Sequence, residues 1–284
     1  MKIPMQLGSY SPEIAAKTAA ELFEKARNYG FTQMQFDFAS LASAEMPERI
    51  SDELLAEIGR EAMKNSIEIR VINGTYNMSH PDAKVREDGA ERFREIVRAA
   101  KVLGCKFISL CAGTRTRGNM WVPHPDNNTP AAWADLSHSV EKVIAIADEF
   151  DIVLLLETED SNVINSPEKT LRLIRQMQSR RLKVIMDCAN LFNHGTAYRH
   201  NVRDIINRGF DLLGEHVACA HGKDIKEGEG LEFVGAGQGI VDFAYFLEKL
   251  DEIGYDDGMI LHGISREDDI PRCIEYIRDT ERHI

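Results

Sequence analysis

The chain has 284 residues, of which 43% are hydrophobic and 28% are charged, so it can bury a sizeable core without disulfides. Its formal net charge of −12 and the lack of a concentrated basic segment argue against binding along a nucleic-acid backbone. No apolar run is long enough to cross a bilayer, and the first residues, MKIPMQLGSY, lack a signal-peptide core, so we expect a cytoplasmic protein with no membrane partner.

Short apolar runs of strand length alternate with amphipathic stretches of helix length along the whole chain. The runs predict eight strands, at residues 3–8, 31–38, 68–74, 105–112, 152–157, 183–187, 217–221 and 258–263. Several runs are apolar on both faces, which is typical of a parallel sheet covered by helices. Eight such units close a barrel, so the predicted fold is an α/β (β/α)8 TIM barrel, with an open doubly wound sheet as the alternative.

The predicted helices between the strands have recognisable starts and buried faces. Ser11-Pro12, Thr129-Pro130 and Ser166-Pro167 each place a capping hydroxyl before a proline that suits the first helical turn. The apolar residues that follow recur at helix spacing and are interpreted as faces packed on the sheet. No break in composition marks a linker, so we predict a single TIM-barrel domain over residues 1–284.

Two predicted connections are much longer than the others, at residues 112–128 and 222–241. Loops of this length inside a compact domain usually line a functional site. The first connection carries Trp121 and His124, an aromatic surface for a sugar beside an imidazole. The second contains GAGQG, which lacks the third glycine and the Gly-Lys-Ser/Thr sequence of nucleotide loops. We interpret it as a tight turn capped by Asp242.

The last four predicted strands each end in a side chain that can bind a metal: Glu157, Asp187, His221 and His262. In a TIM barrel the active site lies at the C-terminal ends of the strands, so these side chains are expected to converge near the axis. Two carboxylates and two imidazoles suit a divalent ion and leave room for substrate oxygens or water. Taken singly, a carboxylate can cap a helix and a histidine can be a core residue, but the common register favours a metal site.

The chain resembles the sugar phosphate isomerase/epimerase family, the xylose isomerase-like TIM barrels. The resemblance rests on the order and spacing of LLLETE at 154–159, VIMDCANLF at 184–192, AHGKD at 220–224 and VGAGQGIVDF at 234–243. It covers the whole barrel and implies a divalent metal cofactor and a small sugar or polyol as substrate. Relatives of this kind often pair as dimers or tetramers, so a homo-oligomer is a family-based expectation.

The resemblance also implies roles for individual residues. Glu157, Asp187 and His221 match three of the family's four usual metal ligands. Lys223 and Asp224 match the polar pair of its His-x-Lys-Asp motif, which implies contacts with the substrate.

Two positions differ from the family pattern. His262 stands where a glutamate usually ends the last strand, and Asn190 stands where a histidine is common. In the family's epimerases two glutamates exchange a proton across the substrate, and only Glu157 remains of that pair here. A metal-bound His262 has no lone pair for a proton, which makes it a poor replacement base. Asn190 either contacts a substrate hydroxyl or fixes the turn after the sixth strand.

The exchange of a carboxylate for an imidazole also changes the expected ion. With two carboxylates instead of three, the ion becomes a stronger Lewis acid. The ligand set therefore favours manganese, iron, cobalt or zinc over magnesium. Glu159 is expected either to support this site or to be solvated.

The loops offer further groups that could supply the missing acid or base. The segment GTYNMSHPD at 74–82 follows the third strand and carries Asn77 and His80. Together with Trp121 and His124, these are candidate substrate-binding residues. The same segments are good turn sequences, so a purely structural role is the alternative.

The combined features predict a divalent-metal-dependent enzyme that moves a proton next to the carbonyl of a sugar or polyol, with Glu157 and His262 as candidate catalytic residues. Isomerisation or epimerisation is the outcome that the family favours. A lyase or dehydratase acting on a keto-sugar or inosose is an alternative, because it needs only one base and an acid. A catalytically silent barrel that binds a sugar or a protein is another. A DNA-repair nuclease is disfavoured by the net charge and by the lack of ligands for three metals.

Overall fold

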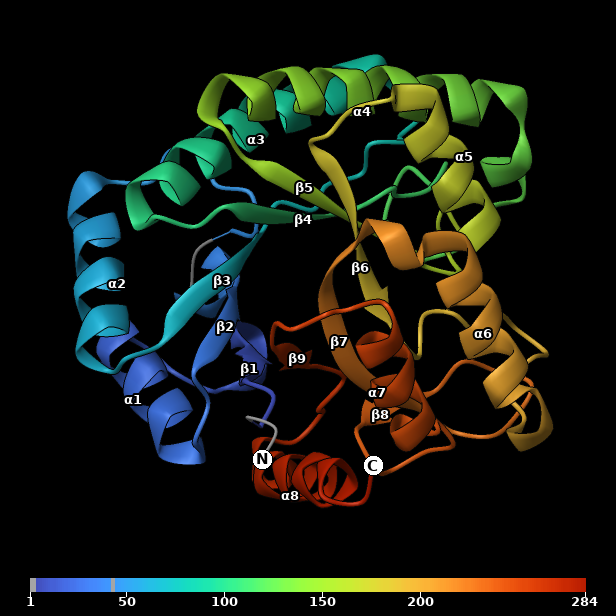
Figure 1. Cartoon of the computed structure of the whole chain (residues 1–284). Coiled ribbons are helices and arrows are strands. Elements are labelled where there is room, and N and C mark those ends of the chain that lie inside the picture. Colours follow the sequence, from blue (N-terminus) through green and yellow to red (C-terminus); the bar gives the residue numbers. More distant parts are fainter. Residues whose placement is uncertain (1–3, 42–43) are drawn as a thin grey trace.

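In the part of the chain that the structure describes, eight parallel strands close into a barrel at the centre of the molecule (Figure 1). The computed structural model describes residues 4–41 and 44–284. In order around the barrel, the strands are β1 (Leu7–Tyr10), β2 (Gln33–Phe36), β3 (Glu68–Asn73), β4 (Phe107–Cys111), β5 (Val153–Glu157), β6 (Leu182–Asp187), β7 (Val217–Ile225) and β9 (Met259–Leu261). Because β9 pairs with β1, the predicted (β/α)8 barrel is confirmed and the open sheet is excluded.

Over the described residues, eight α-helices surround the barrel (Figure 1). They are α1 (Ala19–Tyr29), α2 (Asp52–Lys64), α3 (Ala83–Leu103), α4 (Pro130–Phe150), α5 (Pro167–Met177), α6 (Val202–Leu213), α7 (Phe243–Glu252) and α8 (Ile270–Glu281). The hydroxyls of Thr129 and Ser166 cap α4 and α5, as predicted. Across residues 4–41 and 44–284, no helix combines the length and the apolar character needed to cross a membrane.

The first strand and the first helix lie elsewhere than the sequence predicts. The strand predicted at 3–8 is observed at Leu7–Tyr10, and its predicted first residue, Ile3, lies outside the described residues. The helix begins at Ala19 with Thr18 as its cap, so the prediction of a start at Ser11-Pro12 is wrong. The Ser11 hydroxyl is used differently, because it accepts the backbone N–H of Asp37 at 2.8 Å.

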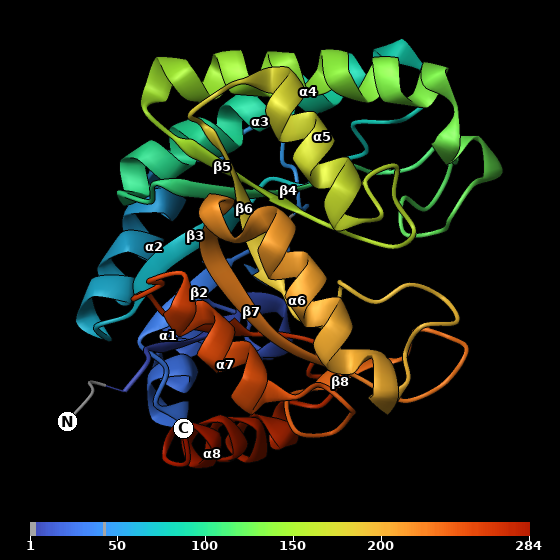
Figure 2. The ribbon, with the colours of Figure 1, turned by 45° about the vertical axis from the view of Figure 1, so that its right-hand side comes forward.

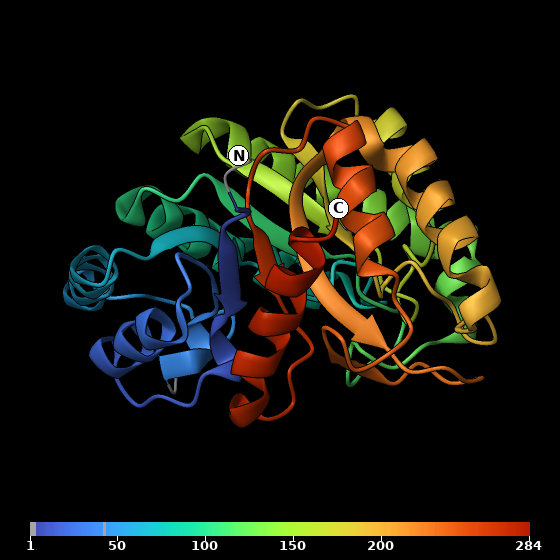
Figure 3. The same ribbon diagram turned by 60° about the horizontal axis from the view of Figure 1, so that its bottom comes forward.

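The last helix, α8, joins the two ends of the chain. Figure 3 shows α8 in red beside β1 in dark blue. The carboxylate of Glu281 accepts the backbone N–H of Met5, and Arg278 donates to the Met5 carbonyl. These contacts hold the N-terminal strand at the seam where the barrel closes.

The connection after β7 contains a short ninth strand, β8 (Phe233–Gly235), which the sequence pattern does not predict. It pairs antiparallel with the extended end of β7. The buried carboxylate of Asp224 holds the glycine-rich turn after β8 by accepting four backbone N–H groups, from Ile225, Gly237, Gly239 and Val241. Asp242 caps the following helix, α7.

A small apolar layer fills the barrel just below its C-terminal mouth. Its buried members are Val71, Leu155, Ile185, Cys219 and Ile260. Side chains alternate between the two faces of a strand, so the residue two positions later also points into the barrel, one level higher. Those residues are Asn73, Glu157, Asp187, His221 and His262. The alternation therefore carries the predicted ligands to the mouth, on the side where the long connections lie at the right of Figure 2.

Candidate metal centre

Three of the four predicted ligands converge at the mouth of the barrel. Glu157, Asp187 and His221 each offer a ligand atom, and these atoms lie within 4.8 Å of one another. His221 Nδ1 is 3.5 Å from Glu157 Oε1 and 3.4 Å from Asp187 Oδ2. All three side chains are buried. In the part of the chain that the structure describes, this is the one such group of histidine, cysteine or acidic residues.

Two of the converging atoms have no hydrogen bond. Asp187 Oδ2 and His221 Nδ1 are buried without a hydrogen-bond partner in the structure. The other oxygen of Asp187 accepts the backbone N–H groups of Ala189 and Asn190, at 2.9 and 3.0 Å, which fixes the carboxylate. Buried polar atoms without partners cost free energy unless a water or an ion satisfies them. The donor set of two carboxylates and one imidazole nitrogen fits a divalent ion.

The buried charged groups of the site shift one another's pKa values. Burial opposes the charge on His221, but the carboxylates of Glu157 and Asp187 outweigh it and raise the pKa of His221 to about 9. Burial also opposes charge on Lys223, but Asp187 and Glu157 raise the pKa of Lys223 overall. Burial raises the pKa of Glu159, beside them, to about 7, although Lys223 opposes this shift. Protons on His221 and Lys223 thus compensate the two carboxylates.

Metal affinity is therefore expected to depend on pH. With its pKa raised to about 9, His221 is protonated at neutral pH, and an ion must displace one proton to reach Nδ1. Below pH 9, affinity should fall by about tenfold for each unit of decreasing pH. Competition with a chelating dye at pH 6, 7 and 8, corrected for the dye's own protonation, measures this slope. An affinity that stays constant between pH 6 and 8 would contradict the assigned ligand.

Asn190 connects Glu157 to Lys223. Its amide nitrogen donates to Glu157 Oε1 at 2.7 Å, and its amide oxygen accepts from Lys223 Nζ at 2.7 Å. Lys223 Nζ also lies 3.3 Å from Asp187 Oδ2 and 4.2 Å from the centre of the Phe233 ring. The asparagine at this position therefore fixes both a candidate ligand and a buried ammonium group.

His262 lies beside the three converging ligands but outside their group. Its Nδ1 is 2.9 Å from Glu13 Oε1, an oxygen that also accepts the backbone N–H groups of Gly263 and Ile264. The ring packs edge-on against Tyr10 and His221, with centroid distances of 4.7 and 5.6 Å. Because Nδ1 donates to the Glu13 carboxylate, only Nε2 is left to bind an ion or a proton.

The backbone conformation and the close packing after His262 explain why residue 263 is a glycine. Gly263 has a φ of +79°, and a Cβ there would lie 2.7 Å from the Lys223 side chain and 3.0 Å from the Val234 carbonyl oxygen. Other residues rarely adopt this φ, and the contact leaves no space for a side chain. The His-Gly pair therefore lets the last strand turn sharply against β7 and β8.

Three of the remaining predicted substrate contacts form hydrogen bonds within the loops of the mouth instead. His80 and His124 each accept, through Nδ1, the backbone N–H two residues later, at 3.1 and 3.2 Å. Asn77 Oδ1 accepts the backbone N–H of Thr114 at 2.9 Å. Trp121 is 46% exposed. The structure brings none of these four side chains into the group of converging ligands, and Asp224 is occupied by the glycine turn.

Three polar side chains at the mouth are missed by the sequence pattern. Gln35 Oε1 lies 2.8 Å from His221 Nε2, Glu13 binds His262, and Asp37 accepts from the Tyr10 hydroxyl at 2.9 Å. The polar alternation in FTQMQFDF was a usable signal for Gln35 and Asp37, since it places polar groups inside the barrel. Glu13 follows the first strand in a short turn that carries no periodic signal.

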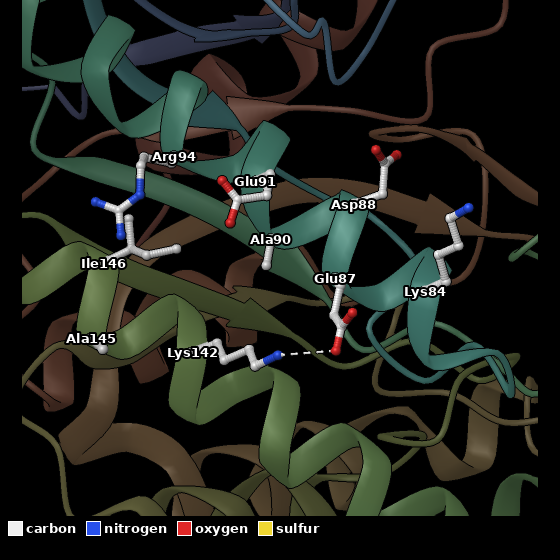
Figure 4. A pocket seen from close by; sticks show the side chains of 9 residues that line it. All are labelled: Lys84, Glu87, Asp88, Ala90, Glu91, Arg94, Lys142, Ala145 and Ile146. Atoms are coloured by element: carbon white, nitrogen blue, oxygen red, sulfur yellow. Dashed lines mark ion pairs between the residues drawn. The ribbon is translucent and has the colours of Figure 1, made fainter.

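A surface groove between α3 and α4 is separate from this centre (Figure 4). It lies on the outer layer of helices and is lined mainly by charged side chains, including the pair Lys142 and Glu87 at 3.8 Å. None of the converging ligands lines it.

The family comparison agrees with the observed barrel. A family model described as a xylose isomerase-like TIM barrel matches residues 23–280. The chain belongs to this family. The earlier resemblance is thereby confirmed, and the sequence motifs at the strand ends can be interpreted within it.

Solved structures with the same fold as this family member include sugar epimerases. A D-tagatose 3-epimerase-like protein has a TM-score of 0.78 at 18% identity, over 98% of each chain. The 3-keto-D-glucoside 4-epimerase of E. coli has a TM-score of 0.75 at 17% identity, over 97% of this chain and 100% of the other. The IolI protein with a bound zinc atom has a TM-score of 0.74 at 15% identity, over 98% and 97%. At these identities the similarity shows the fold alone.

A curated relative, an uncharacterized protein of Methanocaldococcus jannaschii, is 24% identical over 184 residues. The alignment covers 63% of this chain and 58% of the length of that relative.

Proposed function

We propose that this family member is a divalent-metal-dependent enzyme that isomerises or epimerises a sugar or polyol by moving a proton next to a carbonyl. The observation that carries the proposal is the convergence of Glu157, Asp187 and His221. Two of the converging atoms, Asp187 Oδ2 and His221 Nδ1, are buried without a hydrogen bond. The barrel places this group at the mouth, where TIM barrels have their active sites. The sugar epimerases among the structures of similar fold support the substrate class.

In this proposal, Glu157, Asp187 and His221 hold the ion. When bound there, a divalent ion polarises the oxygens of the substrate carbonyl and of the neighbouring hydroxyl. The imidazole nitrogen favours manganese, iron, cobalt or zinc over magnesium, which prefers oxygen ligands. Asp187 is held by two backbone N–H groups and Glu157 by Asn190, so both carboxylates are fixed before an ion arrives.

His262 and Glu13 form the group that moves the proton. The Glu13 carboxylate accepts from Nδ1 and thereby leaves the Nε2 lone pair of His262 free to take a proton from the substrate carbon. The edge-on contact between the rings of His262 and His221, with centroids 5.6 Å apart, supports a role for this nitrogen near the candidate ion site. The position of His262 outside the converging group supports a base in preference to the fourth ligand that the sequence predicts. Glu157 is the proposed partner that exchanges the proton on the other face.

Lys223 supplies positive charge to the substrate. Its ammonium group is buried and is held by Asn190 and Asp187. Loss of a proton from the carbon next to a carbonyl leaves negative charge on the carbonyl oxygen, and a preplaced cation stabilises it. Asn190 thus serves by orienting Lys223 and Glu157, and a direct contact with the substrate is not needed for that role.

A lyase is the second candidate, and the pairing of His262 with Glu13 favours it. A protonated imidazole whose charge is stabilised by a carboxylate can deliver a proton to a leaving hydroxyl group. Dehydration of a keto-sugar or inosose begins with the same proton removal, so the two outcomes differ only in the step that follows.

Proton exchange with heavy water tests the proposed function. The protein is incubated in heavy water with ketoses, inososes and 3-keto sugars, with Mn²⁺ or Zn²⁺ or with a chelator. We expect deuterium at the carbon next to the carbonyl in the metal-loaded sample and none after chelation. Appearance of an isomer identifies an isomerase, and loss of water identifies a lyase. Exchange that continues at the same rate in the chelated sample would refute the metal-dependent proposal.

A further inference from the structure

We propose that Gln35 is a positioning residue of the metal centre, because its amide oxygen fixes the tautomer of His221 that presents Nδ1 to the ion. This inference rests on the proposed metal site and extends it to a residue on the opposite side of the barrel. Gln35 lies on β2 and His221 on β7, and 186 positions separate them in the sequence.

The position of Gln35 follows from the register of the barrel. It pairs with Tyr10 of β1 and with Val71 of β3, and both partners point into the barrel. An irregularity in the β2 and β3 pairing falls between Met34 and Gln35. Bulges of this kind change the direction of side chains near functional sites. The Gln35 side chain therefore extends across the interior instead of packing under the helices.

The contact between Gln35 and His221 is short and is excluded from solvent. Gln35 Oε1 lies 2.8 Å from His221 Nε2, and the two residues are 5% and 1% exposed. A buried N–H without an acceptor costs free energy, so the nitrogen opposite Gln35 is the one that carries the hydrogen. A neutral imidazole has one N–H and one lone pair. With the hydrogen on Nε2, the lone pair lies on Nδ1.

Nδ1 is the nitrogen that faces the two carboxylates. It lies 3.5 Å from Glu157 Oε1 and 3.4 Å from Asp187 Oδ2, and it has no hydrogen bond. If position 35 offered no acceptor, the hydrogen would be more stable on Nδ1, beside the two carboxylates, where it would block the ion. Outer partners that orient a ligand histidine typically change metal affinity by about 10- to 100-fold.

Two substitutions separate this role from packing. Gln35→Met keeps the volume of the side chain but removes the acceptor, and we expect metal affinity to fall by about 10- to 100-fold. Gln35→Glu keeps an acceptor and strengthens it, so its affinity should equal or exceed that of the wild type. A packing role predicts the reverse order, since methionine suits an apolar interior and a buried carboxylate does not.

Gln33→Met is the matched control. Gln33 is a buried glutamine two residues earlier on the same face of β2, and it donates to Asp257 instead of contacting His221. Its substitution should leave metal affinity unchanged. Affinity is measured for Mn²⁺ or Zn²⁺ alone by competition with a chelating dye, on protein whose fold is checked by circular dichroism.

Each outcome decides a different question. Equal affinity of Gln35→Met and wild type overturns the inference about Gln35 but leaves the metal site intact. Affinity lost in Gln35→Glu overturns it as well, even if Gln35→Met does not fold. Failure of the wild type to bind either ion overturns the proposed function itself.

Discussion

Asp187→Asn is expected to lower the affinity for Mn²⁺ or Zn²⁺ by more than about 100-fold, beyond the range for residues that only orient a ligand. One Asp187 oxygen accepts two backbone N–H groups, so the amide oxygen of asparagine takes that position. The amide NH₂ then faces His221 Nδ1 and Lys223 Nζ in place of the negative Oδ2. The ion loses one ligand and one of its two compensating charges. Competition with a chelating dye measures the affinity, and turnover is expected to fall with it.

Asp82→Asn provides the matched control for this substitution. Asp82 caps α3 by accepting the backbone N–H of Lys84, and asparagine is an equally good cap. The control should retain both the fold and the metal affinity. If Asp187→Asn binds metal as tightly as the control, the ligand set proposed here is wrong.

His262→Ala is expected to lower turnover by about 10²- to 10⁴-fold, the usual contribution of a general acid or base. The substitution removes Nε2 but leaves Glu157, Asp187 and His221 in place. Metal affinity should therefore stay close to that of the wild type. Measured together, turnover and affinity separate a base from a ligand, because a fourth ligand would affect both. His138→Ala, an exposed histidine on α4, is the control and should change neither.

A loss of metal in His262→Ala as large as that in Asp187→Asn would make His262 a ligand and leave the proton transfer to another group. Full turnover with bound metal in both His262→Ala and Glu157→Gln would contradict the assignment of the catalytic residues altogether.

The barrel could be predicted because its signal is local. Each strand is a short apolar run, and the alternation of eight runs with amphipathic helices determines the fold class without any long-range contact. Glu157, Asp187 and His221 end apolar runs in the sequence, and alternation along the strands points all three into the barrel. Asp187 pairs in register with His221, and Glu157 pairs with Ile185, two residues before Asp187 on the same face. The caps of α4 and α5 were predicted for the same reason, since a hydroxyl followed by proline acts within one turn.

The contacts of the site that could not be predicted join residues that lie far apart in the sequence. Glu13 and His262 are 249 positions apart, and Gln35 and His221 are 186 apart. Both pairs form only because the barrel closes, so no local pattern identifies the partner. The turn sequences around His80 and His124 were ambiguous, and their imidazoles accept hydrogen bonds from their own loops. Ser11 was misassigned as a cap because its hydroxyl binds Asp37, the residue directly after β2.

Anomalous diffraction from crystals grown with Mn²⁺ or Zn²⁺ tests the central claim most directly. The predicted result is one strong peak at the barrel mouth, within bonding distance of Glu157, Asp187 and His221 Nδ1, with Gln35 still bound to Nε2. A peak at another place, or no peak at these three residues when the ion is in excess, would contradict the metal centre on which the proposed function depends.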